Sequence, residues 1–266
     1  MVTRQPVLVP ATLARGLRGA VVAPHHLATA AGLRILAAGG SAVDAAIATN
    51  AALAVVMPSA CGIGGDAFWL IWEEESAQQF ALNGSGRAPA AANPAALRRA
   101  GLATIPVRGP LAVTVPGAVR SWGDAHARFG RLSHADILAP AMELAGKGFP
   151  AWPGFISSVE RTLPSCVAAL GEGSGFERVY RPNGRPWRLG EPVRLPALAA
   201  TLGRLAEVGF DDFYDGGIAE RQARGLAAVE SAVTADDLRA HRSTWTDPIA
   251  TRTSPTPTSP TARSSG

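Results

Sequence analysis

Cys61 and the histidine pair His25 and His26 are the side chains whose types could support nucleophilic chemistry. A cysteine thiolate attacks a carbonyl carbon when a neighbouring base accepts its proton and a third group orients that base. Nothing in the sequence brings these residues together, and an unpaired cysteine is most often a small buried side chain. We therefore interpret Cys61 as a buried residue at the end of a helix and the histidines as the start of another.

A glycine-rich run, CGIGGDA, begins at Cys61 and places Gly62, Gly64 and Ala67 at the spacing of a dinucleotide-binding fingerprint. That fingerprint follows a strand and opens a helix, whereas this run follows a helix and opens a strand. The order favours a tight turn in which glycine supplies positive φ. We predict no cofactor.

Two carboxylate clusters could suggest a metal site. Glu73, Glu74 and Glu75 lie at the tip of a predicted hairpin, where a solvated loop needs no special role. The DDFYDGG segment, residues 211–217, lacks the twelve-residue ligand pattern of a calcium loop, so we interpret it as a turn between helices. We predict no metal site.

The pattern of apolar residues and caps predicts helices layered on a sheet, an α/β or α+β arrangement. A β-hairpin is expected in the first half of the chain, and the second half is mostly helical. Predicted strands cover residues 67–72, 79–82 and 110–118, and predicted helices cover 24–38, 42–57, 117–129, 196–208 and 216–230, with two more starting at 133 and 234.

Local sequence signals predict where several helices begin. Ser41 with Asp44, and Ser133 with Asp136, have the spacing of a capping box. The helix after Ser41 is apolar almost all round, which is typical of a helix buried among close-packed neighbours.

Composition limits the possible partners. The net charge is +4, yet the 25 basic residues include a single lysine, Lys147, and the arginines are scattered, which argues against nucleic-acid binding. No window of about 18 consecutive apolar residues occurs, so we expect no membrane span. The N-terminus lacks the features of a signal peptide, and the two cysteines have no disulfide or metal spacing. These features favour a cytoplasmic location.

The last residues differ from the rest in composition. Residues 251–266 read TRTSPTPTSPTARSSG, which cannot bury an apolar face, so we predict a disordered tail. The abrupt change also suggests a frameshifted reading frame. We treat residues 1–250 as one region and 251–266 as a separate tail.

Several segments together resemble the γ-glutamyltransferases, also called glutathione hydrolases. They span roughly residues 19–250 and occur in the order seen in that family: GLRILAAGGSAVDAAIATNAALAVVMPSACGIGGDAFWLIW, RAPAA, AVTVPGAVRSW, LAPAMELAGKGFP, LPALAATLGRLAEVGFDDFYDGGIAE and TADDLRAH. The resemblance implies the α+β fold of the N-terminal-nucleophile hydrolases, an αββα sandwich, of which this chain would hold only the large-subunit part.

The resemblance also implies a mechanism. A precursor cuts itself into two subunits, and the new N-terminal threonine of the small subunit is the nucleophile, with its own α-amino group as the base. That threonine-led segment would lie beyond this sequence. We therefore expect no catalytic residue in this chain, no activity of the chain alone, and a small subunit as its partner.

One departure from the family pattern concerns the substrate. Family members usually carry Asp-x-Arg-Glu-x-Ala-Pro, whose arginine holds the substrate α-carboxylate in a charge-assisted pair. Aligned on Ala88 and Pro89, the arginine position is Ser85, and Arg87 follows two residues later. Losing such a pair costs about 2 kcal/mol or more of binding. Ser85 and Arg87 are therefore the predicted substrate-binding residues, and glutathione is a doubtful substrate.

Three hypotheses follow. The first is an amidohydrolase or acylase acting on a small amide other than glutathione, with oxamate and acyl-amide antibiotics as examples. The second is γ-glutamyl transfer or hydrolysis with the carboxylate held by Arg87, against which stands a solvent-facing Arg87 with no such role. The third is a non-catalytic fragment, or a subunit that needs a separately encoded partner.

Overall fold

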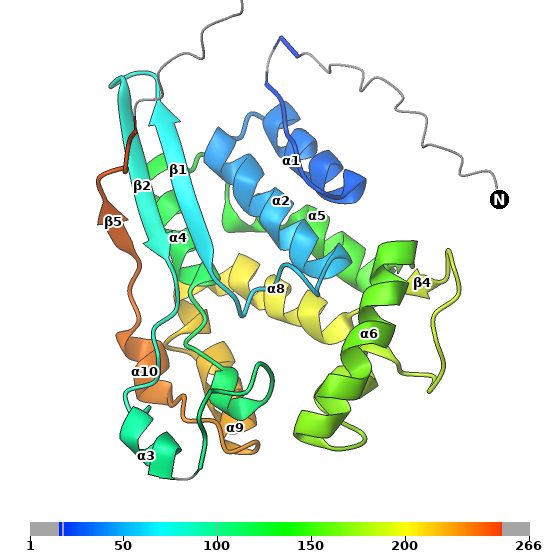
Figure 1. The fold of residues 1–266 in the computed structure, drawn as a ribbon. Helices are drawn as coiled ribbons and strands as arrows, with labels where there is room; N and C mark the ends of the chain where they lie inside the picture. Colours follow the sequence, from blue (N-terminus) through cyan, green and yellow to red (C-terminus); the bar gives the residue numbers. More distant parts are fainter. Residues whose placement is uncertain (1–15, 18, 100, 252–266) are drawn as a thin grey trace, which may run out of the picture.

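The main sheet lies at one side of a helical body in the computed structural model (Figure 1), which describes residues 16, 17, 19–99 and 101–251. Within those residues the sheet is antiparallel, with the strand order β1 (Ala67–Glu73), β2 (Gln78–Gly84) and β5 (Thr244–Thr246). The β1–β2 pair confirms the predicted hairpin. The predicted tail, residues 251–266, lies outside the described residues except for Thr251.

The helical body is built around α2 (Ala42–Val56), in which twelve of fifteen residues are buried, as its all-apolar pattern predicts. It packs against α1 (His26–Ala37), α4 (Ala118–Phe129) and α5 (His134–Lys147), and α5 packs in turn on α8 (Pro196–Val208). The other elements are α3 (Pro94–Arg99), α6 (Pro153–Leu170), α7 (Gly175–Tyr180), α9 (Gly217–Ala227), α10 (Ala235–Ala240), the short strands β3 (Phe149–Pro150) and β4 (Pro192–Val193), and 3-10 helices at Pro110–Ala112 and Phe210–Phe213.

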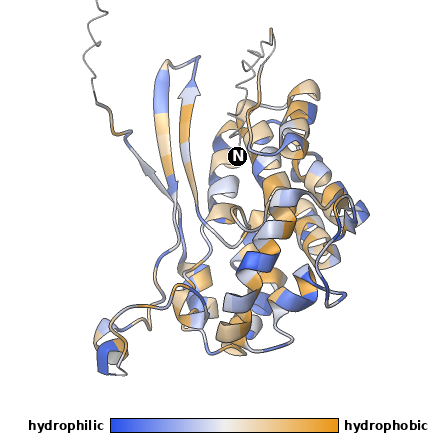
Figure 2. Cartoon of the chain, turned by 45° about the vertical axis from the view of Figure 1, so that its right-hand side comes forward, coloured by the Kyte–Doolittle hydropathy of each residue, from blue (hydrophilic) through white to orange (hydrophobic). Residues whose placement is uncertain are grey.

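The two faces of the hairpin have different surroundings. On one face Trp69 donates from Nε1 to the Ser121 hydroxyl on α4, at 2.9 Å. On the other face Phe68, Leu70 and Trp72 are 72%, 66% and 58% exposed. Figure 2 shows apolar segments along this hairpin, which stands beside the helices. Among the described residues, helices therefore cover only one of the two faces of the sheet.

The strand predicted over 110–118 is wrong. The structure has a 3-10 turn at its start, followed by extended chain that joins no sheet. Its amide groups bond to two loops instead of a strand, because Val115 donates to the Arg87 carbonyl and Gly117 donates to the Gly65 carbonyl. The β-branched residues indicated extended backbone, but sequence alone does not show where its hydrogen bonds go.

The predicted helix caps are mostly confirmed. Ser41 and Asp44 form a complete capping box, and so do Thr234 and Asp237 at the start of α10. The second predicted box is wrong in one half: the Ser133 hydroxyl accepts from the Asp136 amide, but the Asp136 carboxylate bonds that same hydroxyl rather than the Ser133 amide.

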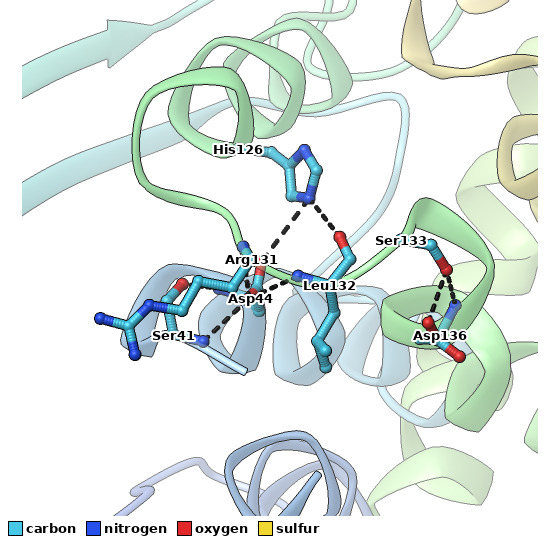
Figure 3. Close-up of polar contacts among 7 residues, drawn as sticks. All are labelled: Ser41, Asp44, His126, Arg131, Leu132, Ser133 and Asp136. Carbon is cyan, nitrogen blue, oxygen red and sulfur yellow. Dashed lines mark hydrogen bonds and ion pairs between the residues drawn. The ribbon is translucent and has the colours of Figure 1, made fainter. Parts of the chain in front are cut away.

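Asp44 joins three parts of the fold (Figure 3). Its side chain is fully buried, and Oδ2 accepts hydrogen bonds from the amides of Ser41 at 2.8 Å, Arg131 at 2.9 Å and Leu132 at 3.2 Å. His126 Nε2 lies 3.6 Å from Oδ1. One carboxylate therefore caps α2 and holds the α4–α5 turn against it.

We expect Asp44→Ala to lower the free energy of unfolding by about 3–5 kcal/mol, because three backbone amides lose a charged acceptor in a buried place. Urea unfolding of the chain measures this. Asp136→Ala is the matched control, since that carboxylate is exposed; it should cost about 0.5–1 kcal/mol. Similar losses in both variants would show that Asp44 is not a structural anchor.

The carboxylates of the DDFYDGG segment each pair with a different arginine. Asp211 pairs with Arg120, and Asp215 pairs with Arg239. Asp212 receives two hydrogen bonds from Arg204, at 2.6 and 2.7 Å, and others from the amides of Gly217 and Ile218. The predicted turn between helices is confirmed, and the Asp212–Arg204 ion pair stabilises it.

The Arg204 hydrogen bonds lower the pKa of Asp212 to about 2. A folded-state pKa below the unfolded value of about 3.9 gives stability that is present above that value and lost as pH falls toward 2. We therefore expect Asp212→Asn to lower Tm most above about pH 5, with the two melting curves converging as pH falls toward about 2. Asp215→Asn removes an exposed pair and should change Tm little at any pH. A Tm difference that does not shrink in acid would contradict this assignment.

Candidate functional site

Three loop segments meet where β1 begins and β2 ends. In the turn at residues 62–66, the Gly65 carbonyl accepts hydrogen bonds from the amides of Gly117 and Ala118, at 2.9 and 2.8 Å. The loop after β2 donates from the Gly86 amide to Asp66 Oδ1 at 2.6 Å. Its Arg87 carbonyl accepts from the Val115 amide at 3.0 Å. We call these segments, residues 62–66, 84–88 and 113–118, the loop junction.

Glycines allow the backbones of the loop junction to approach closely. A Cβ on Gly86 would overlap the Val115 carbonyl oxygen, and a Cβ on Gly117 would overlap the Gly84 carbonyl oxygen. A Cβ on Gly84 would meet the Ser121 side chain. No other residue fits at these positions without moving backbone.

The prediction that Gly62 and Gly64 supply positive φ in a tight turn is wrong. Neither has positive φ, and the Gly65 amide closes their turn on the Gly62 carbonyl at 3.1 Å. Both glycines are exposed. A Cβ added to Gly62 would lie 4.0 Å from the Gly64 nitrogen, and a Cβ added to Gly64 would meet nothing within 4 Å. Their backbone is therefore ordinary, and the surrounding space is open.

Both predicted substrate-binding residues lie in the loop junction. Ser85 is half-buried, and its amide donates to Asn83 Oδ1 at 2.9 Å. Arg87 is exposed, as its solvent-facing alternative predicts. Both residues follow the end of β2 at Gly84, so they lie on a loop rather than on a strand.

Charged and aromatic side chains that the sequence did not single out surround this loop. The Arg120 guanidinium lies 4.3 Å over the Tyr214 ring, and the Arg120 amide donates to the Tyr214 hydroxyl at 2.8 Å. His241, only 2% exposed, stacks on the same ring at 5.6 Å. Burial, followed by the positive charges of Arg120 and Arg87, lowers the pKa of His241. This histidine is therefore neutral at pH 7.

The loop junction offers binding groups rather than an activated nucleophile. Arg87 supplies a guanidinium, Asp66 an exposed carboxylate, and Ser85 a hydroxyl. Among the described residues, no imidazole or carboxylate is hydrogen-bonded to the Ser85 hydroxyl. Such a surface can hold and orient a polar substrate, but the attack on a carbonyl needs a nucleophile from elsewhere.

Cys61, His25 and His26 do not form a catalytic set. His25 caps α1, with Nδ1 accepting from the Leu27 amide at 3.2 Å, as expected for residues that start a helix. Cys61 is half-buried and packs against a buried apolar cluster formed by Ala28, Ala31, Ala52 and Leu53. This burial raises the pKa of its thiol. The thiolate is therefore disfavoured. The described residues hold no group of three or more potential metal ligands. Within that same part of the chain, no helix is both long and apolar enough to cross a membrane.

Comparisons with known proteins assign the fold. The cephalosporin acylase structure from Bacillus halodurans superposes with a TM-score of 0.81 at 34% identity, covering 94% of this chain and 48% of that one. Gamma-glutamyltranspeptidase structures superpose over a similar part of the chain. The chain is thus a mixed α/β region of the N-terminal-nucleophile hydrolase fold. This result confirms the predicted fold.

The family follows from sequence. The gamma-glutamyltranspeptidase family model matches residues 28–265, so the chain belongs to that family. It is 41% identical over 238 residues to the oxamate amidohydrolase proenzyme of Klebsiella pneumoniae, covering 87% of this chain. It is 39% identical over 235 residues to the glutathione hydrolase-like YwrD proenzyme of Bacillus subtilis, covering 88% of this chain. The chain spans 44% of the length of each.

Proposed function

We propose that this chain is the large-subunit region of an amidohydrolase or acylase that acts on an amide other than a γ-glutamyl compound. The observation that carries this is Ser85 at the position where the family arginine holds the substrate α-carboxylate. Ser85 lies in a loop fixed by Asp66 and Val115, so a neutral group is held where a cation is expected. Similarity to an oxamate amidohydrolase and a cephalosporin acylase supports the proposal.

The nucleophile in this proposal is the N-terminal threonine of a small subunit. Its hydroxyl oxygen attacks the amide carbonyl carbon while its α-amino group accepts the proton. The tetrahedral intermediate then expels the amine, which takes up that proton, and leaves an acyl ester on the threonine. Water attacks this ester and releases the acid. The loop junction would orient the amide through the Ser85 hydroxyl, the Arg87 guanidinium and the Asp66 carboxylate.

The open sheet face supports a partner that covers it. Phe68, Leu70 and Trp72 form an apolar stripe on β1 that the described chain leaves exposed. Exposed stripes of this kind usually mark a contact with another layer. In the proposed enzyme that layer is a sheet of the small subunit.

The experiment is co-expression of this chain with a tagged, threonine-led small subunit. The wild-type pair should co-purify and hydrolyse amides, whereas Leu70→Asp should abolish co-purification because it buries an unpaired charge between two sheets. Leu33→Asp is the control: Leu33 is 45% exposed on α1 and should not affect assembly. Assembly that survives Leu70→Asp, or an assembled pair without amidase activity, would contradict the proposal.

A second candidate function is γ-glutamyl turnover with the carboxylate held by Arg87. The observation in its favour is the exposure of the Arg87 side chain, whose backbone is held by Val115. Arg87→Ala should then abolish γ-glutamyl turnover of the assembled enzyme, and unchanged turnover would rule this candidate out. We also propose a cytoplasmic location, which the two free thiols, Cys61 and Cys166, support.

A further inference from the structure

An apolar cavity of about 690 Å³ lies between the turn at residues 62–64 and the start of α8. Apolar parts of Ile63, Tyr180, Leu195 and Leu198 line it, and Cys61 contributes its half-buried thiol. A volume of this order matches the pockets that hold drug-sized molecules. The cavity can therefore hold an aromatic or branched aliphatic group, which is larger than oxamate.

The charge at the cavity has one sign. Arg178 and Arg194 are the charged residues among those that line it, and both are exposed. Each is fixed by a neutral backbone carbonyl, Arg178 by Gly173 and Arg194 by Lys147, so neither guanidinium charge is neutralised by that bond. A guanidinium presents paired donors that fit a carboxylate. The ligand that complements this cavity is apolar with an anionic end.

The cavity adjoins the loop junction. Gly62, Ile63 and Gly64 line the cavity, and the next two residues, Gly65 and Asp66, make the hydrogen bonds that hold the loop junction. One short turn thus forms the wall of the cavity and the edge of the candidate site. A molecule whose reacting amide lies at the loop junction can extend its other end into the cavity.

We propose that this cavity is the subsite for the non-reacting part of the substrate, an aromatic or branched aliphatic group that ends in a carboxylate. This inference rests on the proposed function for its role in turnover. As a binding site for a hydrophobic carboxylate it rests on the cavity and the two arginines alone. The substrate class is then an amide with a large apolar carboxylate-bearing group, rather than a small amide such as oxamate.

The binding experiment uses Cys61 as a reporter. With Cys166 replaced by serine, Cys61 is the one remaining cysteine, and its alkylation by iodoacetamide at alkaline pH is followed by mass spectrometry. We expect 4-phenylbutyrate to slow this alkylation, and its neutral isostere 4-phenylbutyramide to be at least about tenfold weaker, since it lacks the charge-assisted bonds. Acetate, which cannot fill the cavity, should not protect.

Two variants and a control test the assignment to this cavity. Exchanging Arg178 and Arg194 together for methionine should lower the affinity for 4-phenylbutyrate about tenfold or more and leave the amide unchanged. Ala197→Trp should fill the cavity and block both ligands. Arg221→Met, at an exposed arginine on α9, should change neither. Circular dichroism verifies that each variant is folded.

The outcomes separate this inference from the proposed function. Absence of protection, or equal protection by acid and amide that the double arginine variant does not alter, overturns the subsite. Protection that requires both arginines supports it, even if the assembled enzyme turns over no amide and the proposed function fails. If the assembled enzyme hydrolyses amides with a kcat/KM that the double arginine variant leaves unchanged for carboxylate-bearing substrates, the subsite fails and the proposed function stands.

Discussion

Gly86→Ala is expected to lower the free energy of unfolding by about 3 kcal/mol or more and to abolish any activity of the assembled enzyme. An added Cβ would overlap the carbonyl oxygen of Val115, which is backbone and cannot rotate away. Val115 is itself held by its hydrogen bond to Arg87 and by its buried side chain. The only relief is separation of the two segments, which displaces the loop that carries Ser85.

Gly64→Ala is the matched control for this variant. Gly64 lies two residues before Asp66 and is exposed, and an added Cβ would meet nothing within 4 Å. Its φ is not positive, so alanine should be tolerated within about 0.5 kcal/mol. Urea unfolding of both variants gives the comparison. Equal stability of the two would show that the loop junction is not closely packed at Gly86.

Ser85→Arg is expected to raise kcat/KM of the assembled enzyme for γ-glutamyl-p-nitroanilide by about 10- to 100-fold. The substitution restores a cation at the position where the family holds the α-carboxylate, and a charge-assisted pair contributes about 1.5–3 kcal/mol. Ser85 is half-buried at a fixed point of the loop, so the new side chain starts from a defined backbone position.

Ser85→Gln provides the control for size without charge and should leave γ-glutamyl turnover low. The same variants should be assayed with a non-γ-glutamyl amide to detect a general loss of activity. If Ser85→Arg assembles, retains its other activity and gains no γ-glutamyl turnover, the residue at this position does not decide the substrate.

The fold was predictable where the signals are local. The capping box at Ser41, the helix start at Thr234, and the two apolar runs of the hairpin depend on neighbours within a few positions, and the structure confirms them. The strand predicted at 110–118 failed because its hydrogen-bond partners, Arg87 and Gly65, are distant in sequence.

The site was predictable only in part. The resemblance predicted Ser85 and Arg87 as substrate-binding residues, and the structure places both in the loop junction. The sequence did not show that Asp66 contacts Gly86 across 20 positions or that Tyr214 contacts Arg120 across 94. No periodicity in one sequence reports such pairings. The glycines after Cys61 were predicted to supply positive φ in a tight turn, whereas Gly84, Gly86 and Gly117 are the ones whose missing side chains the structure requires.

The most direct test of the central claim is the ratio of two kcat/KM values for the processed wild-type enzyme. One substrate is γ-glutamyl-p-nitroanilide, and the other is a non-γ-glutamyl amide, either oxamate or the anilide of an apolar dicarboxylic acid. The account predicts that the non-γ-glutamyl amide is preferred by about 10-fold or more, since no cation stands at position 85. Efficient hydrolysis of γ-glutamyl-p-nitroanilide, with no preference for either alternative amide, would contradict it.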